Sequence, residues 1–300
     1  MADIRYDGRV AVITGAGGGL GKTYALMLAG RGAKVVVNDL GGKADGTGAS
    51  HGAADQTAQE IRAAGGEAIA NYDSVSTPEG GEAITKAALD AFGRVDIVIN
   101  NAGILRDKTF AKMTPDELNA VLDVHLKGAF YVTQPAFRVM KEQNYGRIVV
   151  TASAAGLFGN FGQTNYGAAK MGLVGLSNVL AIEGAKNNIM CNAIAPIAKT
   201  RMTEQLLGPL AEFVKPELVT PLVAYLVSEQ CAVTHNVFSV GGGRYARIFV
   251  GLTPGWFAGK DNAPSVEDIA EHLDEIRNPD GYIIPDGIGD EMRQIAKLLR

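Results

Sequence analysis

Short apolar runs rich in β-branched residues recur along the chain and alternate with longer stretches of helical patterning. The runs lie at residues 9–13, 34–39, 67–73, 95–101, 147–153 and 189–195, with a weaker one at 237–240. Helices are expected at about 21–32, 54–65, 79–92, 115–142 and 164–187. Buried strands separated by helices are typical of a parallel sheet covered on both faces. The sequence therefore predicts a doubly wound, Rossmann-type α/β fold of about seven strands.

The segment after residue 245 departs from this alternation. It begins with an irregular stretch and continues as the helical sequence "SVEDIAEHLDEI", where Ser265 is the expected N-cap and Asp268 completes a capping box. Pro279 is expected to end that helix. The predicted division is a main domain over residues 1–245 and a C-terminal helical extension over 246–300.

Composition excludes several classes of function. Of the 300 residues, 47% are hydrophobic and 20% are charged, which is ordinary for a globular protein with a substantial core. The net charge of −4 gives no reason to expect nucleic acid or a membrane surface as a partner. Cys191 and Cys231 are too few for a disulfide framework or a cysteine zinc site. Because His51, His235 and His272 share no ligand spacing, we expect no metal.

Neither a secretory leader nor a membrane anchor is expected. The opening "MADIRYDGRV" has no apolar segment of the kind found in signal peptides. No apolar run approaches the ~18 residues that cross a bilayer, and the final "KLLR" differs from the peroxisomal tripeptide address. The sequence thus predicts a cytoplasmic protein.

A glycine-rich turn follows the first predicted strand and opens the first helix. In "TGAGGGLG" (14–21), Gly15 permits the turn, while Gly19 and Gly21 allow close approach of a pyrophosphate and tight helix–strand packing. Leu20 lies between them, where the helix N-terminus offers unpaired N–H groups to phosphates. This context predicts a dinucleotide site, with a plain glycine turn as the alternative.

Polar residues end the next strands at the same edge of the sheet. Asp39 follows the second strand, about 20 residues after the glycines, where a carboxylate can accept the adenosine-ribose hydroxyls and repel a 2′-phosphate. Asp39 and the lack of Lys or Arg within the turn favour NAD over NADP. Asp73 is expected near the adenine amine, and Asn101, Ala102 and Gly103 end the fourth strand. A loop-capping Asp39 and a structural Asp73 are the alternatives.

Ser153 ends the fifth strand, and Tyr166 and Lys170 share one face of the following helix. A free phenol has a pKa of about 10, so a base near neutrality needs a pKa about 3 lower, equivalent to about 4 kcal/mol. A cation about 4 Å away supplies about that energy at an effective dielectric constant of about 20. The spacing predicts that Lys170 lowers the pKa of Tyr166, which acts as general base. A surface pair over small residues is the alternative.

Together these motifs resemble the short-chain dehydrogenase/reductase family over about residues 8–245. The stretches "NDLGGKADGTG", "NNAGILRDKTFAKM" and "DVHLKGAF" are similar to the (3R)-hydroxyacyl-CoA dehydrogenase units of type 2 peroxisomal multifunctional enzymes. The resemblance implies NAD as cofactor and a small-molecule substrate, either an acyl-CoA or a steroid. It also implies a homodimer built on the helices at 115–142 and 164–187, with the extension packed on its own domain or on the dimer partner.

The expected reaction is oxidation of (3R)-3-hydroxyacyl-CoA to 3-oxoacyl-CoA. Tyr166 would take the hydroxyl proton, Ser153 would hold the substrate oxygen, and Lys170 would also bond the nicotinamide ribose. Oxidation of a 17β-hydroxysteroid and reduction of a 3-oxoacyl-carrier protein are alternatives on the same site, the second disfavoured by Asp39. A cofactor-binding scaffold without turnover is disfavoured by the intact Ser153, Tyr166 and Lys170.

Two positions depart from the family's pattern. His125 stands in "DVHLKG" where many members have a catalytic asparagine, and it is expected to hold a water that relays protons to Lys170. A packed core histidine is the alternative. After the sixth strand the family's "PGxxxT" reads "PIAKT", so Pro196 and Thr200 are expected at the cofactor, with Thr200 bonding the nicotinamide carboxamide. Ile197 removes backbone freedom there.

Overall fold

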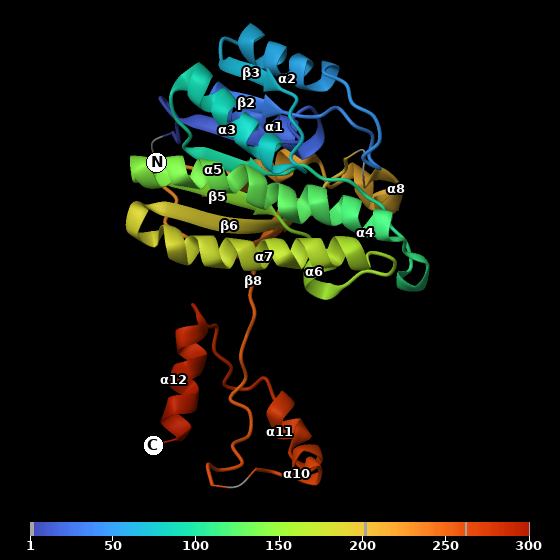
Figure 1. The fold of residues 1–300 in the computed structure, drawn as a ribbon, viewed down its shortest axis with the longest axis vertical. Coiled ribbons are helices and arrows are strands. Elements are labelled where there is room, and N and C mark those ends of the chain that lie inside the picture. Colours follow the sequence, from blue (N-terminus) through green and yellow to red (C-terminus); the bar gives the residue numbers. More distant parts are fainter. Residues whose placement is uncertain (1–2, 201–202, 262, 300) are drawn as a thin grey trace. The chain divides into compact units, whose positions relative to one another are not determined.

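A twisted sheet with the strand order β3-β2-β1-β4-β5-β6-β7-β8 forms the centre of the larger part of the chain (Figure 1). The computed structural model describes residues 3–200, 203–261 and 263–299. The strands are β1 (Val10–Thr14), β2 (Lys34–Asn38), β3 (Glu67–Asn71), β4 (Ile97–Asn100), β5 (Gly146–Thr151), β6 (Ile189–Pro196), β7 (Val237–Gly241) and β8 (Arg244–Ile248). Strands β1 to β7 pair in parallel, so the prediction of a doubly wound parallel sheet is confirmed.

Strand β8 was not predicted from the sequence. Gly242 and Gly243, with φ of +57° and +80°, connect it to β7. Two central residues with positive φ form the type I′ turn that suits a two-residue hairpin. Strand β8 therefore runs antiparallel to β7, at the edge of an otherwise parallel sheet.

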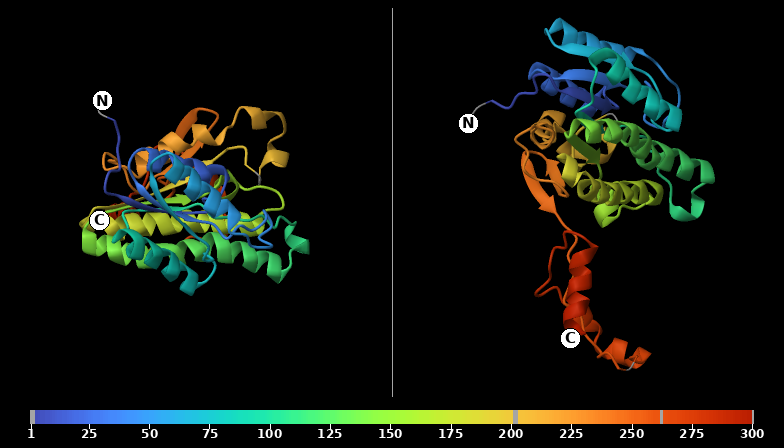
Figure 2. Two further views of the ribbon diagram at one scale, coloured as in Figure 1. Left: turned by 90° about the horizontal axis from the view of Figure 1, so that it is seen from above. Right: turned by 60° about the vertical axis from the view of Figure 1, so that its left-hand side comes forward.

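Helices cover both faces of the sheet (Figure 2). One layer holds α1 (Gly19–Gly30), α2 (Gly52–Ala63) and α9 (Thr220–Leu226), and the other holds α3 (Pro78–Phe92), α5 (Gly128–Gln143) and α7 (Thr164–Gly184). Shorter helices are α4 (Pro115–Leu122), α6 (Ala154–Phe158) and α8 (Glu204–Leu207), with 3₁₀ turns at Phe110–Lys112, Ala185–Asn187, Gly208–Glu212 and Pro216–Leu218. Apolar side chains such as Ile13, Val35 and Leu28 are fully buried between these layers, which explains the continuous apolar strands.

A π-helical turn, Asp123–Lys127, interrupts the helix that the sequence predicts over residues 115–142. It joins α4 to α5 and carries His125 on its inner side, where the residue is buried. Single π turns within helices are frequent at functional sites. Residue patterning contained no signal for this one.

The strand order reverses beside β1, because β2 and β3 lie on one side of it and β4 to β7 on the other. In open α/β sheets the ligand crevice lies at the carboxyl ends of the strands at this reversal. Gly15 follows β1, Asn101 follows β4 and Ser153 follows β5, so all three reach the same edge.

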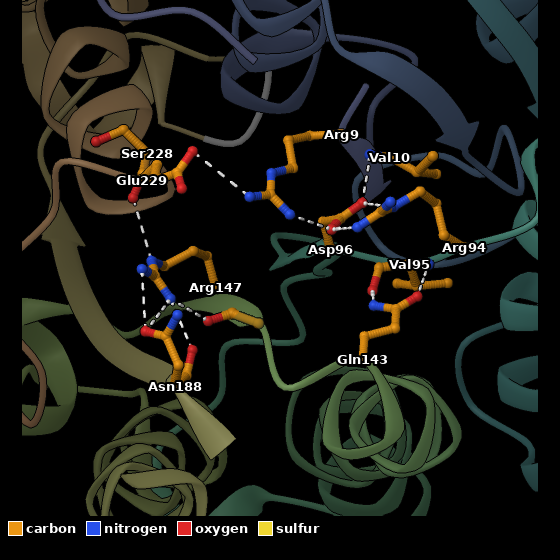
Figure 3. Close-up of polar contacts among 11 residues, drawn as sticks. Arg9, Val10, Arg94, Val95, Asp96, Gln143, Arg147, Asn188, Ser228 and Glu229 are labelled. Carbon is orange, nitrogen blue, oxygen red and sulfur yellow. Dashed lines mark hydrogen bonds and ion pairs between the residues drawn. The ribbon is translucent and has the colours of Figure 1, made fainter. Parts of the chain in front are cut away.

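The amino edge of the sheet carries a buried ion-pair cluster (Figure 3). The Asp96 side chain is fully buried and accepts hydrogen bonds from Arg9 (3.0 Å), from the Val10 N–H (2.9 Å) and from two nitrogens of Arg94 (2.7 Å each). Arg9 also approaches Glu229 at 3.5 Å, but the Glu229 side chain is 74% exposed. This cluster ties the start of β1 to the start of β4.

Arg147 on β5 is 2% exposed, and no carboxylate pairs with it in the described part of the chain. Its guanidinium donates to the carbonyl oxygens of Ser228 (3.1 Å), Gly146 (2.8 Å) and Asn188 (2.8 Å) (Figure 3). It also lies over the ring of Tyr145, 4.5 Å from the centroid. Carbonyl dipoles and a π face thus compensate the buried cation and join β5 to the segments after α9 and before β6.

Residues 248–300 form a second compact unit with helices α10 (Val266–Glu271), α11 (Leu273–Arg277) and α12 (Ile288–Leu298). The predicted capping box of Ser265 and Asp268 is confirmed, and the helix ends before Pro279 as expected. However, His272 divides that helix in two and stacks on Trp256 with ring centroids 4.0 Å apart. No described residue of this unit is buried.

The ion-pair cluster generates a stability prediction. Asp96→Ala is expected to lower the free energy of unfolding by about 3 kcal/mol, the low end for breaking a buried pair, because both arginines reach solvent. The matched control is Glu229→Ala, which removes an exposed partner of Arg9 and is expected to change stability by less than about 0.5 kcal/mol. Urea unfolding of both variants measures the difference, and equal losses would contradict the assigned role of Asp96.

Candidate active site

A cleft of about 570 Å³ opens at the carboxyl edge of the sheet. Its volume lies in the range of small-molecule sites, roughly 300–1,000 Å³. The cleft is lined by almost all the residues that the sequence indicated: Gly15, Gly19, Leu20, Asp39, Asp73, Asn101, Ala102, Gly103, His125, Ser153, Tyr166, Lys170, Pro196 and Thr200. Gly21 does not line the cleft but packs beneath it.

The glycine turn requires glycine at two positions for steric reasons. Gly15 has φ of +64°, and a Cβ atom there would lie 2.9 Å from the Ala102 Cα. At Gly21 a Cβ would lie 2.2 Å from the carbonyl oxygen of Gly15. Helix α1 begins at Gly19, and the first N–H groups of a helix have no partner within it. The turn therefore brings backbone donors to the cleft with no side chain in the way.

Four hydrogen bonds join the ends of β1 and β4. The Asn101 Nδ2 donates to the carbonyl oxygens of Thr14 (3.0 Å) and Gly15 (3.1 Å). The Thr14 Oγ1 accepts from the N–H groups of Asn101 (3.0 Å) and Ala102 (3.1 Å). Asn101 thus holds the glycine turn with its amide. Thr14 was not singled out from the sequence, although its place at the end of the strand is a usable signal.

Asp39 caps the glycine turn and also lines the cleft. Its Oδ2 accepts from the Gly17 N–H at 2.8 Å, and its Oδ1 accepts from the Gly41 N–H at 2.7 Å. The loop-capping alternative is therefore present. A carboxylate has about four acceptor sites, so these two bonds leave capacity for ribose hydroxyls. Asp73 accepts from the Asn71 Nδ2 at 2.7 Å and lines the cleft beside β3.

The Gly-rich loop between β2 and α2 is fixed to the segment that follows β4. The Leu105 N–H donates to the Ala44 carbonyl at 2.9 Å, and the Arg106 Nε donates to the Asp45 carbonyl at 2.7 Å. Because β1 lies between β2 and β4, these bonds carry the loop across the end of β1 (Figure 1). The loop therefore forms a wall of the cleft, a placement that depends on tertiary contacts.

Ser153, Tyr166 and Lys170 come together in the cleft. Ser153 is the N-cap of α6, where its Oγ accepts from the Ala155 N–H at 3.2 Å. Lys170 is 3% exposed, and its Nζ donates to the Thr151 carbonyl at 2.5 Å. The same Nζ lies 5.4 Å from the centre of the Tyr166 ring. The arrangement places a cation beneath a phenol that also meets a serine hydroxyl.

Burial dominates the protonation of this group. Removal of the ammonium from water lowers the pKa of Lys170 to about 7. Burial raises the pKa of Tyr166, the hydrogen bond with Ser153 lowers it, and the negative charge of Asp107 raises it further. The pKa of Tyr166 in the protein without cofactor is therefore raised, whereas the sequence predicted that Lys170 lowers it. Desolvation has the largest effect on Tyr166, and Lys170 is itself only partly charged near neutrality.

His125 is 4% exposed and lies edge-on to Tyr166, with ring centroids 5.1 Å apart. Its Nε2 lies 2.8 Å from the Ile104 carbonyl oxygen and 3.0 Å from the Ile104 nitrogen, so it can donate to the carbonyl or accept from the N–H, and Nδ1 then takes the opposite role. At Gly103 a Cβ would lie 2.3 Å from the His125 Cε1, so only glycine permits this packing. Burial and the nearby Lys170 lower the pKa of His125 well below its usual value. The Nδ1 is buried, with no partner among the described residues.

A water-sized cavity of about 10 Å³ lies beside His125 and Lys170. Thr14 and Asn100 contribute further polar lining. A polar cavity of about this size can hold one water. His125 is therefore both a packed core residue and a neighbour of a site where water fits.

Pro196 ends β6 and lines the cleft together with Thr200. The Thr200 N–H donates to the Thr203 Oγ1 at 2.9 Å, and the two hydroxyls lie 3.1 Å apart. A Cβ built at Gly19 would lie 3.5 Å from the Thr200 Cγ2, so Thr200 lies against the glycine turn. Its predicted contact with the carboxamide stays a prediction.

Among the residues whose placement is described, no three His, Cys, Asp or Glu side chains gather as metal ligands would. Across the same residues, no helix is both long and apolar enough to span a bilayer.

The family model described as "short chain dehydrogenase" matches residues 9–208. The chain belongs to the short-chain dehydrogenase/reductase family. Within it, the chain is 57% identical over 274 residues to a short-chain type dehydrogenase/reductase of Mycobacterium tuberculosis, covering 91% of this chain and 95% of that protein. As a member of this family it is an oxidoreductase that acts on CH–OH groups with a nicotinamide cofactor.

Two further relatives are longer proteins, and this chain matches only part of each. The chain is 49% identical over 298 residues to peroxisomal multifunctional enzyme type 2 of Mus musculus, covering 99% of this chain and 40% of that protein. The structure of full-length peroxisomal multifunctional enzyme type 2 from Drosophila melanogaster matches with a TM-score of 0.83 and 39% identity, over 99% of this chain and 50% of that one. The resemblance to this branch of the short-chain dehydrogenase/reductase family is confirmed.

Proposed function

We propose that the chain oxidises (3R)-3-hydroxyacyl-CoA to 3-oxoacyl-CoA with NAD, a reaction type of fatty acid β-oxidation. The observation that carries the proposal is the meeting of Ser153, Tyr166 and Lys170 in one cleft with the glycine turn. The 49% identity to a peroxisomal multifunctional enzyme type 2 supports the choice of substrate, because the sequence motifs resemble the (3R)-hydroxyacyl-CoA dehydrogenase units of that group.

In the proposed reaction Tyr166 takes the proton of the substrate hydroxyl. Ser153 hydrogen-bonds the same oxygen and keeps it beside the phenol. Lys170 stabilises the negative charge that the phenolate carries. When bound, NAD would supply the acceptor for the hydride that leaves the carbinol carbon.

The residues of the cleft fit a dinucleotide. The first turn of α1 supplies N–H donors for the pyrophosphate, and Gly15 and Gly21 leave that approach open. Asp39 supplies acceptors for the adenosine ribose beyond its two bonds to the backbone. These features favour NAD, because a 2′-phosphate beside Asp39 would meet a like charge.

A proton route from Lys170 also belongs to the proposal. A water in the small cavity donates a hydrogen bond to the His125 Nδ1, which is an acceptor when Nε2 donates to Ile104. The proton taken by Tyr166 passes to Lys170 and from there to this water, which releases a proton to bulk solvent. His125 stays neutral and orients the water.

The proposed base generates the next prediction. Tyr166→Phe is expected to keep NADH binding and to lower the kcat for oxidation by about 10²-fold or more, the scale of general acid–base catalysis. NADH absorbance with (3R)-3-hydroxyacyl-CoA measures kcat, and NADH fluorescence measures binding. Retention of near-normal kcat would show that Tyr166 is not the base.

The substrate class is tested with the same wild-type assay. The (3R)-3-hydroxyacyl-CoA should exceed its (3S) isomer, a 17β-hydroxysteroid and a 3-hydroxyacyl-carrier protein in kcat/KM. A higher value with the carrier protein or the steroid would replace the acyl-CoA assignment. The catalytic roles of Ser153, Tyr166 and Lys170 would remain.

Cofactor preference is tested at Asp39. Asp39→Ala is expected to weaken NAD binding by about one to two orders of magnitude, since a charge-assisted hydrogen bond is worth roughly 1.5–3 kcal/mol. NADP loses no ribose bond of this kind and gains from the removed repulsion, so the NAD/NADP ratio of kcat/KM should narrow. It need not reverse, because the glycine turn contains no Lys or Arg.

A control separates ribose recognition from loosening of the turn. Asp39→Ala also frees the N–H groups of Gly17 and Gly41, which affects both cofactors. Asp45→Ala removes a similar backbone cap, at the Thr47 N–H in the same loop, and should leave the cofactor ratio unchanged. A wild type that prefers NADP, or equal ratios in all three proteins, would contradict the role of Asp39.

A homodimer through α4, α5 and α7 is also proposed. Large apolar side chains stand exposed on these helices, among them Leu118, Phe130, Val179 and Ile182. Light scattering should give the mass of a dimer, and Val179→Glu combined with Ile182→Glu should give a monomer, because buried carboxylates would be unpaired. A wild-type monomer or a stable tetramer would count against the interface.

The extension is proposed to pack on its own main domain or on the dimer partner. Within residues 248–300 no described side chain is buried, although Ile288, Met292 and Ile295 of α12 are large and apolar. A unit of this size rarely supplies enough core by itself. We therefore expect the apolar side chains of α12 to be covered by a surface outside the unit.

A further inference from the structure

The residue before the proposed base, Asn165, is buried and uses every polar atom of its side chain. It is 1% exposed. Its Oδ1 accepts from the Tyr166 N–H at 2.8 Å, while its Nδ2 donates to the carbonyl oxygens of Arg106 (3.0 Å) and Glu117 (3.1 Å). One amide therefore joins the first turn of α7 to the segment after β4 and to α4.

This arrangement compensates for a missing cap. The first N–H groups of a helix lack partners within it, and the N-cap of α7, Gln163, makes no capping bond with its side chain. Asn165 satisfies one such N–H from inside the helix and connects it to fixed backbone atoms elsewhere. Gln163 instead donates to the Asp107 Oδ2 at 2.7 Å, and the Lys108 N–H donates to the Gly162 carbonyl at 2.8 Å. Residues 106–108 thus hold the start of α7 at successive points.

We propose that Asn165 is a positioning residue for Tyr166, which it holds by bonding the first turn of α7 to residues 106 and 117. The proposal rests on the proposed role of Tyr166 as base. The phenol must meet Ser153 on one side and His125 on another, so a shift of the first turn moves it from both. A displacement of about 1 Å at a reacting group can cost about 10²-fold in rate.

The kinetic test uses Asn165→Ala with Asn192→Ala as the matched control. Asn192 is 0% exposed, its amide donates to the Val233 carbonyl (2.8 Å) and accepts from the Asn236 N–H (3.2 Å), and it does not line the cleft. Asn165→Ala should lower kcat by about 10- to 100-fold while KM and NADH affinity change little. Asn192→Ala should lower Tm and leave kcat unchanged. Equal loss of kcat in both, or normal kcat in Asn165→Ala, would overturn the proposal.

The second variant, Asn165→Asp, keeps the shape and the acceptor for the Tyr166 N–H but removes both donors and adds a negative charge. The charged or titratable groups that face Tyr166 are Lys170 on α7, His125 in the π turn and Asp107 after β4. A carboxylate at 165 should raise the pKa of Tyr166, so the limb of the kcat profile that rises with pH should move to higher pH. Asn165→Ala adds no charge, so any movement of the same limb in that variant reports displacement alone, and a residue with a purely structural role would leave the limb of Asn165→Ala in place.

A measurement without turnover keeps this test separate from the proposed function. Titration of ¹³C-labelled tyrosine by NMR, with Tyr166→Phe to assign the signal, reports the pKa of Tyr166 directly. Both Asn165 variants should raise it, since displacement loosens the Ser153 hydrogen bond that lowers it. An unchanged Tyr166 titration in both variants would overturn the positioning role, even if the wild type oxidised none of the thioesters.

Discussion

The site depends on the hydrogen bonds between Thr14 and Asn101 at the point where the strand order reverses. The chain leaves β1 and β4 in different directions there, which opens the crevice and would let the two strand ends separate. Two bonds to the Thr14 Oγ1 and two from the Asn101 amide hold them together. The glycine turn follows one strand, and the segment that contacts His125 and Asn165 follows the other. The glycine turn and the start of α7 therefore depend on the same junction.

Buried polar and charged groups are fully paired at the amino edge of the sheet and incompletely paired at the carboxyl edge. At the amino edge, Asp96 accepts four hydrogen bonds and Arg147 donates to three carbonyl groups, so both charges are compensated. At the carboxyl edge, burial lowers the pKa of Lys170, and the His125 Nδ1 has no partner within the described chain. Compensated charge stabilises the fold, whereas incompletely paired groups remain able to exchange protons.

Local spacing made the parallel strands, the glycine turn and the Tyr166–Lys170 pair predictable, because each depends on neighbours in the sequence. Strand β8 was missed since the glycine run before it fits a loop as well as a hairpin. The π turn at His125 and the partners of Asn165 follow from packing between segments distant in the chain. The direction of the pKa shift of Tyr166 could not be predicted from the sequence either, because desolvation depends on what covers a side chain rather than on its spacing.

In the proposed reaction, Tyr166 and Lys170 act as one acid–base unit. Burial lowers the pKa of Lys170 to about 7 and raises that of Tyr166, so the ordinary value of neither applies. When the pair loses a proton near pH 7, the two residues share the one that remains, whether as phenol and amine or as phenolate and ammonium. Either form can accept one proton from a substrate. The proposed reaction therefore does not need a tyrosine whose own pKa is depressed. It needs a buried lysine beneath the phenol. The same burial that raises the pKa of Tyr166 lowers the pKa of Lys170.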